Sequence, residues 1–281
     1  MARPSNDHRR GRGRSAASNR AGIESRMAMM KIGAVLVAVI AIGAFYFTVA
    51  SSRRSLDPET LCPTMADSVT VLLVDVTDPM NTAQRQDFAN QLAKLKNSIP
   101  RYGKLIVAKV DATGDKLLAP VITRCNPGTA EDVSSTTGDP GAVQKQWVEG
   151  FDKPLTLAFE RLGTASGADQ SPILESIQSI ALTELQKPGL EKTPKRLIVA
   201  SDLLQNTGDV SFYRSLPDPR AFIDSSVFRR MRTDLRGVDV ELWMLERTDA
   251  ASTQPRSLAE LWEHIIDAEG GEVRRIYNVS G

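Results

Sequence analysis

Oxygen-bearing side chains occur at three separated points of this sequence, each beside an apolar run or a helical pattern. Asp75 and Thr77 directly follow the apolar run at residues 69–74. Ser171 opens a helical pattern near the middle of the chain, and Asp202 ends the run LIVASD. Carboxylates and hydroxyls on separate loops suit a hard divalent cation such as Mg²⁺, which prefers oxygen ligands and retains waters. These residues predict a cation site if the fold brings the three points together.

The elements around these residues alternate between strand and helix patterns. Residues 69–74 are β-branched or aliphatic throughout, and residues 195–200 end in the apolar run LIVA, as in strands buried on both faces of a parallel sheet. Further strand patterns and intervening helical periodicities fill the rest, with strands at 104–110, 121–123, 239–245 and 272–277 and helices at 88–99, 142–162, 171–186, 221–236 and 258–269. This order predicts an α/β fold with a doubly wound, mostly parallel sheet and helices on both faces. Because such sheets place ligand sites where the strands end, Asp75 and Asp202 are expected at one edge.

The N-terminal part has the composition of a membrane anchor. Residues 32–51 contain no charged side chain, and about 20 apolar residues are what an α-helix needs to cross a bilayer core. Residues 1–31 carry eight Lys and Arg against two acids, which predicts a disordered basic tail held in the cytoplasm. A cleaved signal peptide is the alternative, although the apolar run exceeds the usual length of its core.

Four parts are therefore expected: a tail at 1–31, a transmembrane helix at 32–51, a linker at 52–67 and an extracytoplasmic domain at 68–281. The domain would be periplasmic in a Gram-negative cell. Residues 32–281 carry a net formal charge of −5 within a total of +1, which argues against nucleic-acid binding by the globular part. No glycine-rich phosphate-binding motif is present, so nucleotide binding is not expected.

Cys62 and Cys125 are the two cysteines of the chain. An extracytoplasmic compartment permits disulfides, so the pair is a candidate bridge. Two buried thiols are the alternative, because spacing alone does not show that the sulfurs meet. Only two histidines accompany them, so a zinc site is not expected.

On these residues the chain resembles a von Willebrand factor A (VWA) domain over about residues 68–279. In that family a metal-ion-dependent adhesion site begins with D-x-S-x-S after the first strand. Asp75 matches the first aspartate, and Thr77 stands where the first serine would be. Ser171 is placed like the threonine or serine of the second loop, and Asp202 like the aspartate after the fourth strand.

The resemblance implies a protein-binding module in an envelope assembly, with Mg²⁺ or Mn²⁺ bridging to an acidic side chain of the partner. The implied metal ligands are Asp75, Thr77, Ser171 and Asp202. Pro79 departs from the family pattern, because it stands in the place of the second serine and has no hydroxyl. The metal site is thus a degenerate form of the family's site.

Two other hypotheses remain open at this stage. One is a metal-independent VWA-like scaffold that uses its sheet edge or helices for protein contacts. The other is a phosphoryl hydrolase with Asp75 as the nucleophile. The phosphatase pattern of that type has a second aspartate two residues on, where this chain has Thr77, so we expect a protein without enzymatic activity.

Overall fold

The computed structural model of this chain describes residues 14–51, 54–77, 80–110, 117–136, 138–162, 169–247 and 254–279. The chain divides into two compact units, Met1–Arg54 and Ser55–Gly281. We describe each unit by itself. Asp78 and Pro79, the residues at which the motif departs from the VWA pattern, lie outside the described part.

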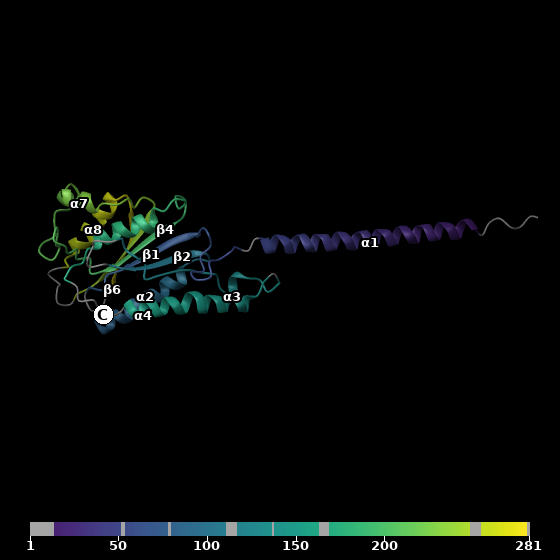
Figure 1. The fold of residues 1–281 in the computed structure, drawn as a ribbon, viewed down its shortest axis with the longest axis horizontal. Coiled ribbons are helices and arrows are strands. Elements are labelled where there is room, and N and C mark those ends of the chain that lie inside the picture. Colours follow the sequence, from purple (N-terminus) through teal and green to yellow (C-terminus); the bar gives the residue numbers. More distant parts are fainter. Residues whose placement is uncertain are drawn as a thin grey trace, which may run out of the picture. The chain divides into compact units, whose positions relative to one another are not determined.

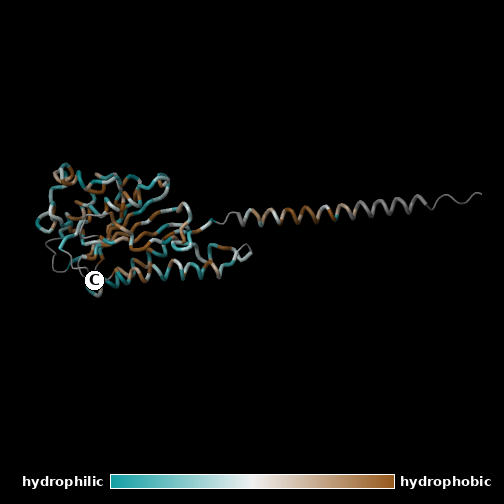
Figure 2. The backbone as a smooth tube through the Cα atoms, viewed as in Figure 1, coloured by the Kyte–Doolittle hydropathy of each residue, from teal (hydrophilic) through white to brown (hydrophobic). Residues whose placement is uncertain are grey.

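The first unit is built on one helix, α1 (Arg14–Ser51) (Figure 1). Its segment Met29–Thr48 is long and apolar enough to cross a membrane, and none of it is buried within the protein. Figure 2 shows this apolar stretch as brown turns of α1. A helix that is apolar all round is stable only when protein or lipid covers it, so this helix supports the predicted membrane anchor.

The helix begins earlier than the sequence suggested. We expected residues 1–31 to be unfolded, but α1 already starts at Arg14. Nucleation is the costly step of helix formation, and each residue added to an existing helix contributes one further hydrogen bond. The apolar segment supplies that nucleus, and the alanines that precede it favour continuation towards the N-terminus.

The second unit is built on one six-stranded sheet with the order β3-β2-β1-β4-β5-β6. The strands are β1 (Ser68–Val74), β2 (Gly103–Lys109), β3 (Ile122–Cys125), β4 (Lys195–Ser201), β5 (Val238–Leu245) and β6 (Glu272–Val279). Every neighbouring pair is parallel except β2 and β3. The predicted fold class, a doubly wound and mostly parallel sheet, is confirmed. The strand order reverses direction between β1 and β4, and such switch points are where these sheets bind ligands.

Helices cover both faces of the sheet (Figure 1). One face carries α2 (Thr82–Ser98), α3 (Pro140–Trp147) and α4 (Lys153–Leu162), and the other carries α5 (Ile173–Ile180), α6 (Pro219–Ile223), α7 (Ser226–Met231) and α8 (Arg256–Ala268). Alternate residues of β1 serve the two cores: Val71 and Leu73 pack with α5 and α8, whereas Leu72 and Val74 pack with α2. All four side chains are fully buried, which explains why this strand reads as an unbroken apolar run.

Two helical segments are interrupted where the sequence has local signals. A π-helical turn at Val148–Asp152 separates α3 from α4, next to Pro154. The segment expected as one helix at 221–236 forms the two short helices α6 and α7 instead. Asp218 and Ser225 each cap a separate helix start by accepting a backbone N–H, so the chain begins a second helix after only one turn.

A disulfide joins Cys62 to Cys125, with their Cα atoms 4.8 Å apart, which confirms the predicted bridge. Cys125 ends the edge strand β3, and its N–H donates to the carbonyl of Thr60 at 2.9 Å. Leu56 and Pro63 form a further isolated bridge in the same segment. The stretch before β1, expected to be an irregular linker, is therefore fixed to the edge of the sheet.

Candidate functional site

The end of β1, the start of α5 and the end of β4 meet at the carboxyl edge of the sheet, the edge where the parallel strands end. Asp75 lies at the centre and is 4% exposed. Its Oδ2 accepts hydrogen bonds from Oγ of Ser171 at 2.6 Å and Oγ of Ser201 at 2.9 Å. Its Oδ1 accepts from Oγ1 of Thr77 at 2.7 Å and from the Thr77 N–H at 3.0 Å. The first two of the three separated points of the sequence are therefore in direct contact, and Ser201 leads to the third, Asp202.

Asp202 lies at the same edge, one residue beyond β4, and is 5% exposed. Its Oδ1 accepts from the Leu204 N–H at 2.9 Å and from the Ser201 hydroxyl at 3.4 Å. Its Oδ2 accepts from the Tyr213 hydroxyl at 3.0 Å. The Ser201 hydroxyl thus contacts both Asp75 and Asp202. We call Asp75, Thr77, Ser171, Ser201 and Asp202 the edge site.

The backbone after β4 has an unusual conformation that holds Asp202 in place. Leu203 has a φ of +62°, a left-handed conformation that a branched side chain seldom adopts. Its N–H donates to the Ser201 hydroxyl at 2.9 Å, and its carbonyl accepts from the Trp262 indole N–H at 2.8 Å. Such strain persists where surrounding contacts impose it, and here those contacts come from β4 and α8.

Arg247, two residues beyond β5, brings a positive charge to the edge site. Its Nε lies 2.5 Å from Oδ2 of Asp202, and its guanidinium stacks over the ring of Tyr213 at 5.2 Å from the ring centre. The side chain is 24% exposed, compared with 6% for Asp202. Burial lowers the pKa of Arg247 and the charge of Asp75 opposes that change, but a guanidinium stays protonated in proteins.

Two glutamines fix the backbone that carries Arg247. Gln254 accepts the Arg247 N–H at 2.7 Å and donates to the carbonyls of Leu245 and Asp202, both at 3.0 Å. Gln84, from the first turn of α2, donates to the carbonyl of Glu246. The segment after β5 is thereby tied to β4 and α2, so the arginine approaches Asp202 from a fixed position.

Burial dominates the electrostatics of the edge site. Burial, and then the negative charge of Asp75, raise the pKa of Asp202 to about 7, although hydrogen bonds from Leu204, Tyr213 and Ser201 act in the opposite direction. Burial and the nearby Asp202 also raise the pKa of Tyr213, which keeps its hydroxyl protonated as a donor. Two carboxylates buried this close together repel each other, so a neighbouring cation is needed for both to be ionised.

The predicted metal ligands Asp75, Thr77, Ser171 and Asp202 are all brought together, and their oxygens are of the type that Mg²⁺ or Mn²⁺ prefers. Their arrangement does not fit a hydrated divalent cation. The cavity that Asp75, Asp202 and Arg247 line is about 30 Å³, room for about two water molecules. No third His, Cys, Asp or Glu joins the two aspartates within the described residues, and Arg247 already lies against Asp202. Metal binding stays a prediction.

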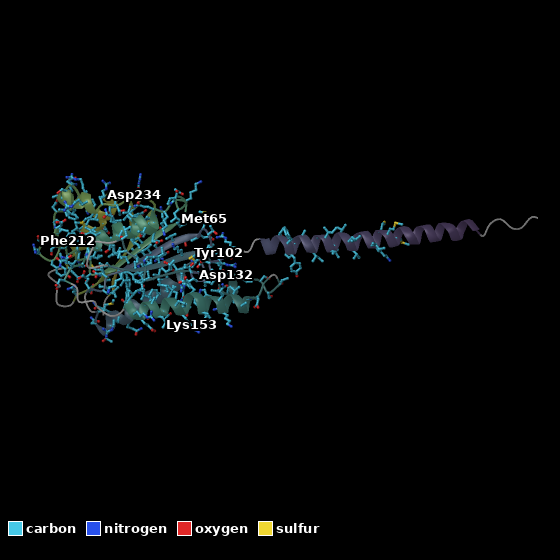
Figure 3. The ribbon with its side chains drawn as sticks, in the orientation of Figure 1. Met65, Tyr102, Asp132, Lys153, Phe212 and Asp234 are labelled. Carbon is cyan, nitrogen blue, oxygen red and sulfur yellow. A yellow bond between two sulfur atoms is a disulfide. The ribbon has the colours of Figure 1, made fainter. Side chains whose placement is uncertain are left out.

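Sequence reasoning missed Ser201, Tyr213, Arg247 and Gln254. The strand-end rule that singled out Asp75 would also have drawn attention to Ser201 and Arg247, which end or follow parallel strands. Tyr213 and Gln254 lie in loops whose spacing carries no such signal. Figure 3 labels Phe212, the neighbour of Tyr213, at one end of the domain, and Tyr102, which precedes β2, at the other.

Comparisons with known proteins give low similarity throughout. No family model matches the sequence, and no curated protein matches it. Among solved structures, the conserved hypothetical protein BatB from Bacteroides thetaiotaomicron aligns at 10% identity and a TM-score of 0.40, over 75% of this chain and 91% of that one. An aerotolerance-related membrane protein from Bacteroides fragilis NCTC 9343, with multiple mutations to serines, aligns at 11% and 0.36, over 76% and 92%.

A von Willebrand factor type A protein from Catenulispora acidiphila aligns at 14% identity and a TM-score of 0.31, over 74% of this chain and 43% of that one. At such scores these similarities carry no argument about function. The fold class follows from the strand order and from the helices on both faces, and the functional argument depends on the edge site.

Proposed function

We propose that this protein is a membrane-anchored protein-binding module of the VWA type, whose partner docks at the carboxyl edge of the sheet. One observation carries the proposal: two buried carboxylates, Asp75 and Asp202, are held together at the switch point between β1 and β4. Burying charged groups is costly, and apolar packing would stabilise the same junction without that cost. A charged cluster at a ligand-binding edge therefore favours a role in binding.

The anchor places this module at a membrane. We propose that α1 spans the bilayer with the basic N-terminal segment in the cytoplasm, as the positive-inside rule predicts. The globular unit would then be extracytoplasmic, or periplasmic in a Gram-negative cell. The Cys62–Cys125 disulfide supports this orientation, because disulfides persist in oxidising compartments.

We propose that the partner presents an acidic side chain. Asp75 and Asp202 alone would repel a carboxylate, so docking of this kind needs a cation at the edge. Mg²⁺ or Mn²⁺ is one source of that charge, and Arg247 is the other. The geometry gives less support to the hydrolase hypothesis, because each carboxylate oxygen of Asp75 already accepts two hydrogen bonds and is poorly placed for nucleophilic attack.

Affinity capture from cross-linked cells tests the docking surface. The exposed Glu246 lines the same cavity as Asp75 and Asp202. Glu246→Trp adds bulk there without changing the core. Lys192→Trp is the matched control, since it adds the same bulk at an exposed position just before β4, at the opposite edge. We expect a partner captured by the wild type and by Lys192→Trp to be lost with Glu246→Trp. Equal capture by all three proteins would reject the carboxyl edge as the docking surface.

A further inference from the structure

The edge site contains more negative charge than its surroundings can solvate. Asp75 and Asp202 are both less than 6% exposed, and the Ser201 hydroxyl contacts the two carboxylates. Hydroxyl and amide donors stabilise carboxylates but add no compensating charge. Two carboxylates in a poorly hydrated site stay ionised together only beside a cation, which the molecule either binds from solution or supplies itself.

Contacts with Asp202, Tyr213 and Gln254 position Arg247 as that cation. Its guanidinium is ion-paired with Asp202 and stacks on the Tyr213 ring, and the Tyr213 hydroxyl donates to the same carboxylate oxygen. Its backbone N–H is accepted by Gln254, which also bonds Leu245 and Asp202. A surface arginine without such constraints would sample many rotamers, whereas this side chain is held against Asp202 from both ends.

A divalent cation and this guanidinium compete for the same place. A metal bound to Oδ2 of Asp202 would lie within a few ångströms of Arg247, in a cavity of about 30 Å³, where two positive charges repel strongly. Metal binding would require Arg247 to leave both Asp202 and the Tyr213 ring. The sequence also disfavours a metal site, because Pro79 stands in the place of the second serine and lacks its hydroxyl.

We propose that Arg247 takes the place of the divalent cation at the edge site, and that the protein partner docks at this edge without metal. This inference rests on the proposed function of the carboxyl edge as a docking surface. A guanidinium stays protonated in proteins, so the positive charge that it brings to Asp202 is permanent. Its ion pair with Asp202 fixes that charge beside the carboxylates, in the place that a bound metal would occupy.

Metal titration of the full chain in detergent micelles tests the substitution. Isothermal titration calorimetry with MnCl₂ and MgCl₂ would compare the wild type with Arg247→Ala and Arg274→Ala. Arg274 is the matched control, because it is an exposed arginine on β6 that pairs with Asp239 and Glu272. We expect Arg247→Ala to bind Mn²⁺ at least tenfold more tightly than the wild type and Arg274→Ala, which should bind equally weakly.

Two results would overturn the proposal. The first is wild-type Mn²⁺ binding as tight as that of Arg247→Ala and abolished by Asp202→Asn. The second is a folded Arg247→Ala protein that gains no affinity for metal. If Arg247→Ala does not fold, Arg247→Gln removes the charge but keeps a long side chain, and it carries the same expectation. Electron paramagnetic resonance of Mn²⁺ added to the wild type measures whether the wild type binds this metal tightly, and this measurement needs no variant.

Partner capture separates this inference from the proposed function. With Arg247 as the cation, capture by the wild type is unchanged by chelator and is reduced at least tenfold in Arg247→Gln. Capture that is lost on chelation would reject the inference but retain the docking surface. Because the metal titration needs no partner, its outcome stands even if Glu246→Trp shows that docking occurs elsewhere.

Discussion

The hydrogen bond between Ser171 and Asp75 joins the segment before α5 to the end of β1 within the edge site. A double-mutant cycle measures its contribution to stability. The perturbations are Asp75→Asn and Ser171→Ala, alone and combined. Both side chains are at most 4% exposed, and their oxygens are 2.6 Å apart across 96 positions of sequence. A buried hydrogen bond to a charged group contributes about 1.5 to 3 kcal/mol, so Ser171→Ala should lose about that much stability.

The cycle isolates the pairwise contribution. We expect the double variant to be about 1.5 kcal/mol more stable than the sum of the single changes predicts, because the second substitution removes a contact that the first has already weakened. Urea unfolding of the unit Ser55–Gly281, followed by the fluorescence of the buried Trp243 and Trp262, gives the four free energies.

Ser179→Ala provides the matched control for that cycle. This serine, near the end of α5, is also buried, but its hydroxyl accepts the Leu118 N–H at 2.6 Å. Combined with Asp75→Asn, Ser179→Ala should be additive within about 0.5 kcal/mol. A Ser171–Asp75 coupling no larger than that of the control would refute the claim that this hydrogen bond holds the edge site together.

The remaining predictions concern stability away from the edge site. Because the disulfide joins residues separated by 63 positions, the chain-entropy model predicts that Cys62→Ser combined with Cys125→Ser lowers the free energy of unfolding by about 4 kcal/mol, which urea unfolding would measure; a loss below about 1 kcal/mol would contradict it. Burial raises the pKa of Glu269 from 4.5 to about 8, despite the Thr233 N–H and the charge of Arg232. The folded protein then holds a proton that the unfolded chain loses above about pH 4.5, so this residue should make stability fall by about 1.4 kcal/mol per pH unit up to about pH 8. Glu269→Gln should remove that component from thermal unfolding measured at pH 5, 6.5 and 8, and an unchanged pH profile would show that Glu269 is not buried in its protonated form.

Local patterns in the sequence determined the elements of this protein. Residues 71–74 and 197–200 are apolar on both faces because helices cover both faces of the sheet, and the confirmed strands β1 and β4 follow from that pattern. The uncharged run at 32–51 predicted a helix long and apolar enough to span a membrane, because both properties are local to the sequence. The strand-end positions of Asp75 and Asp202 predicted where a site would lie.

The partners of those aspartates were decided only by the tertiary structure. Ser201 reaches Asp75 across 126 positions of sequence. Arg247 reaches Asp202 from the segment after β5. Such contacts depend on the strand order and on the direction of each side chain, which are properties of the whole sheet. Periodicity is encoded in short windows and contains no information about which loops meet. The sequence therefore predicted the carboxylates of the edge site, whereas the cation beside them became visible only when the strands were placed side by side.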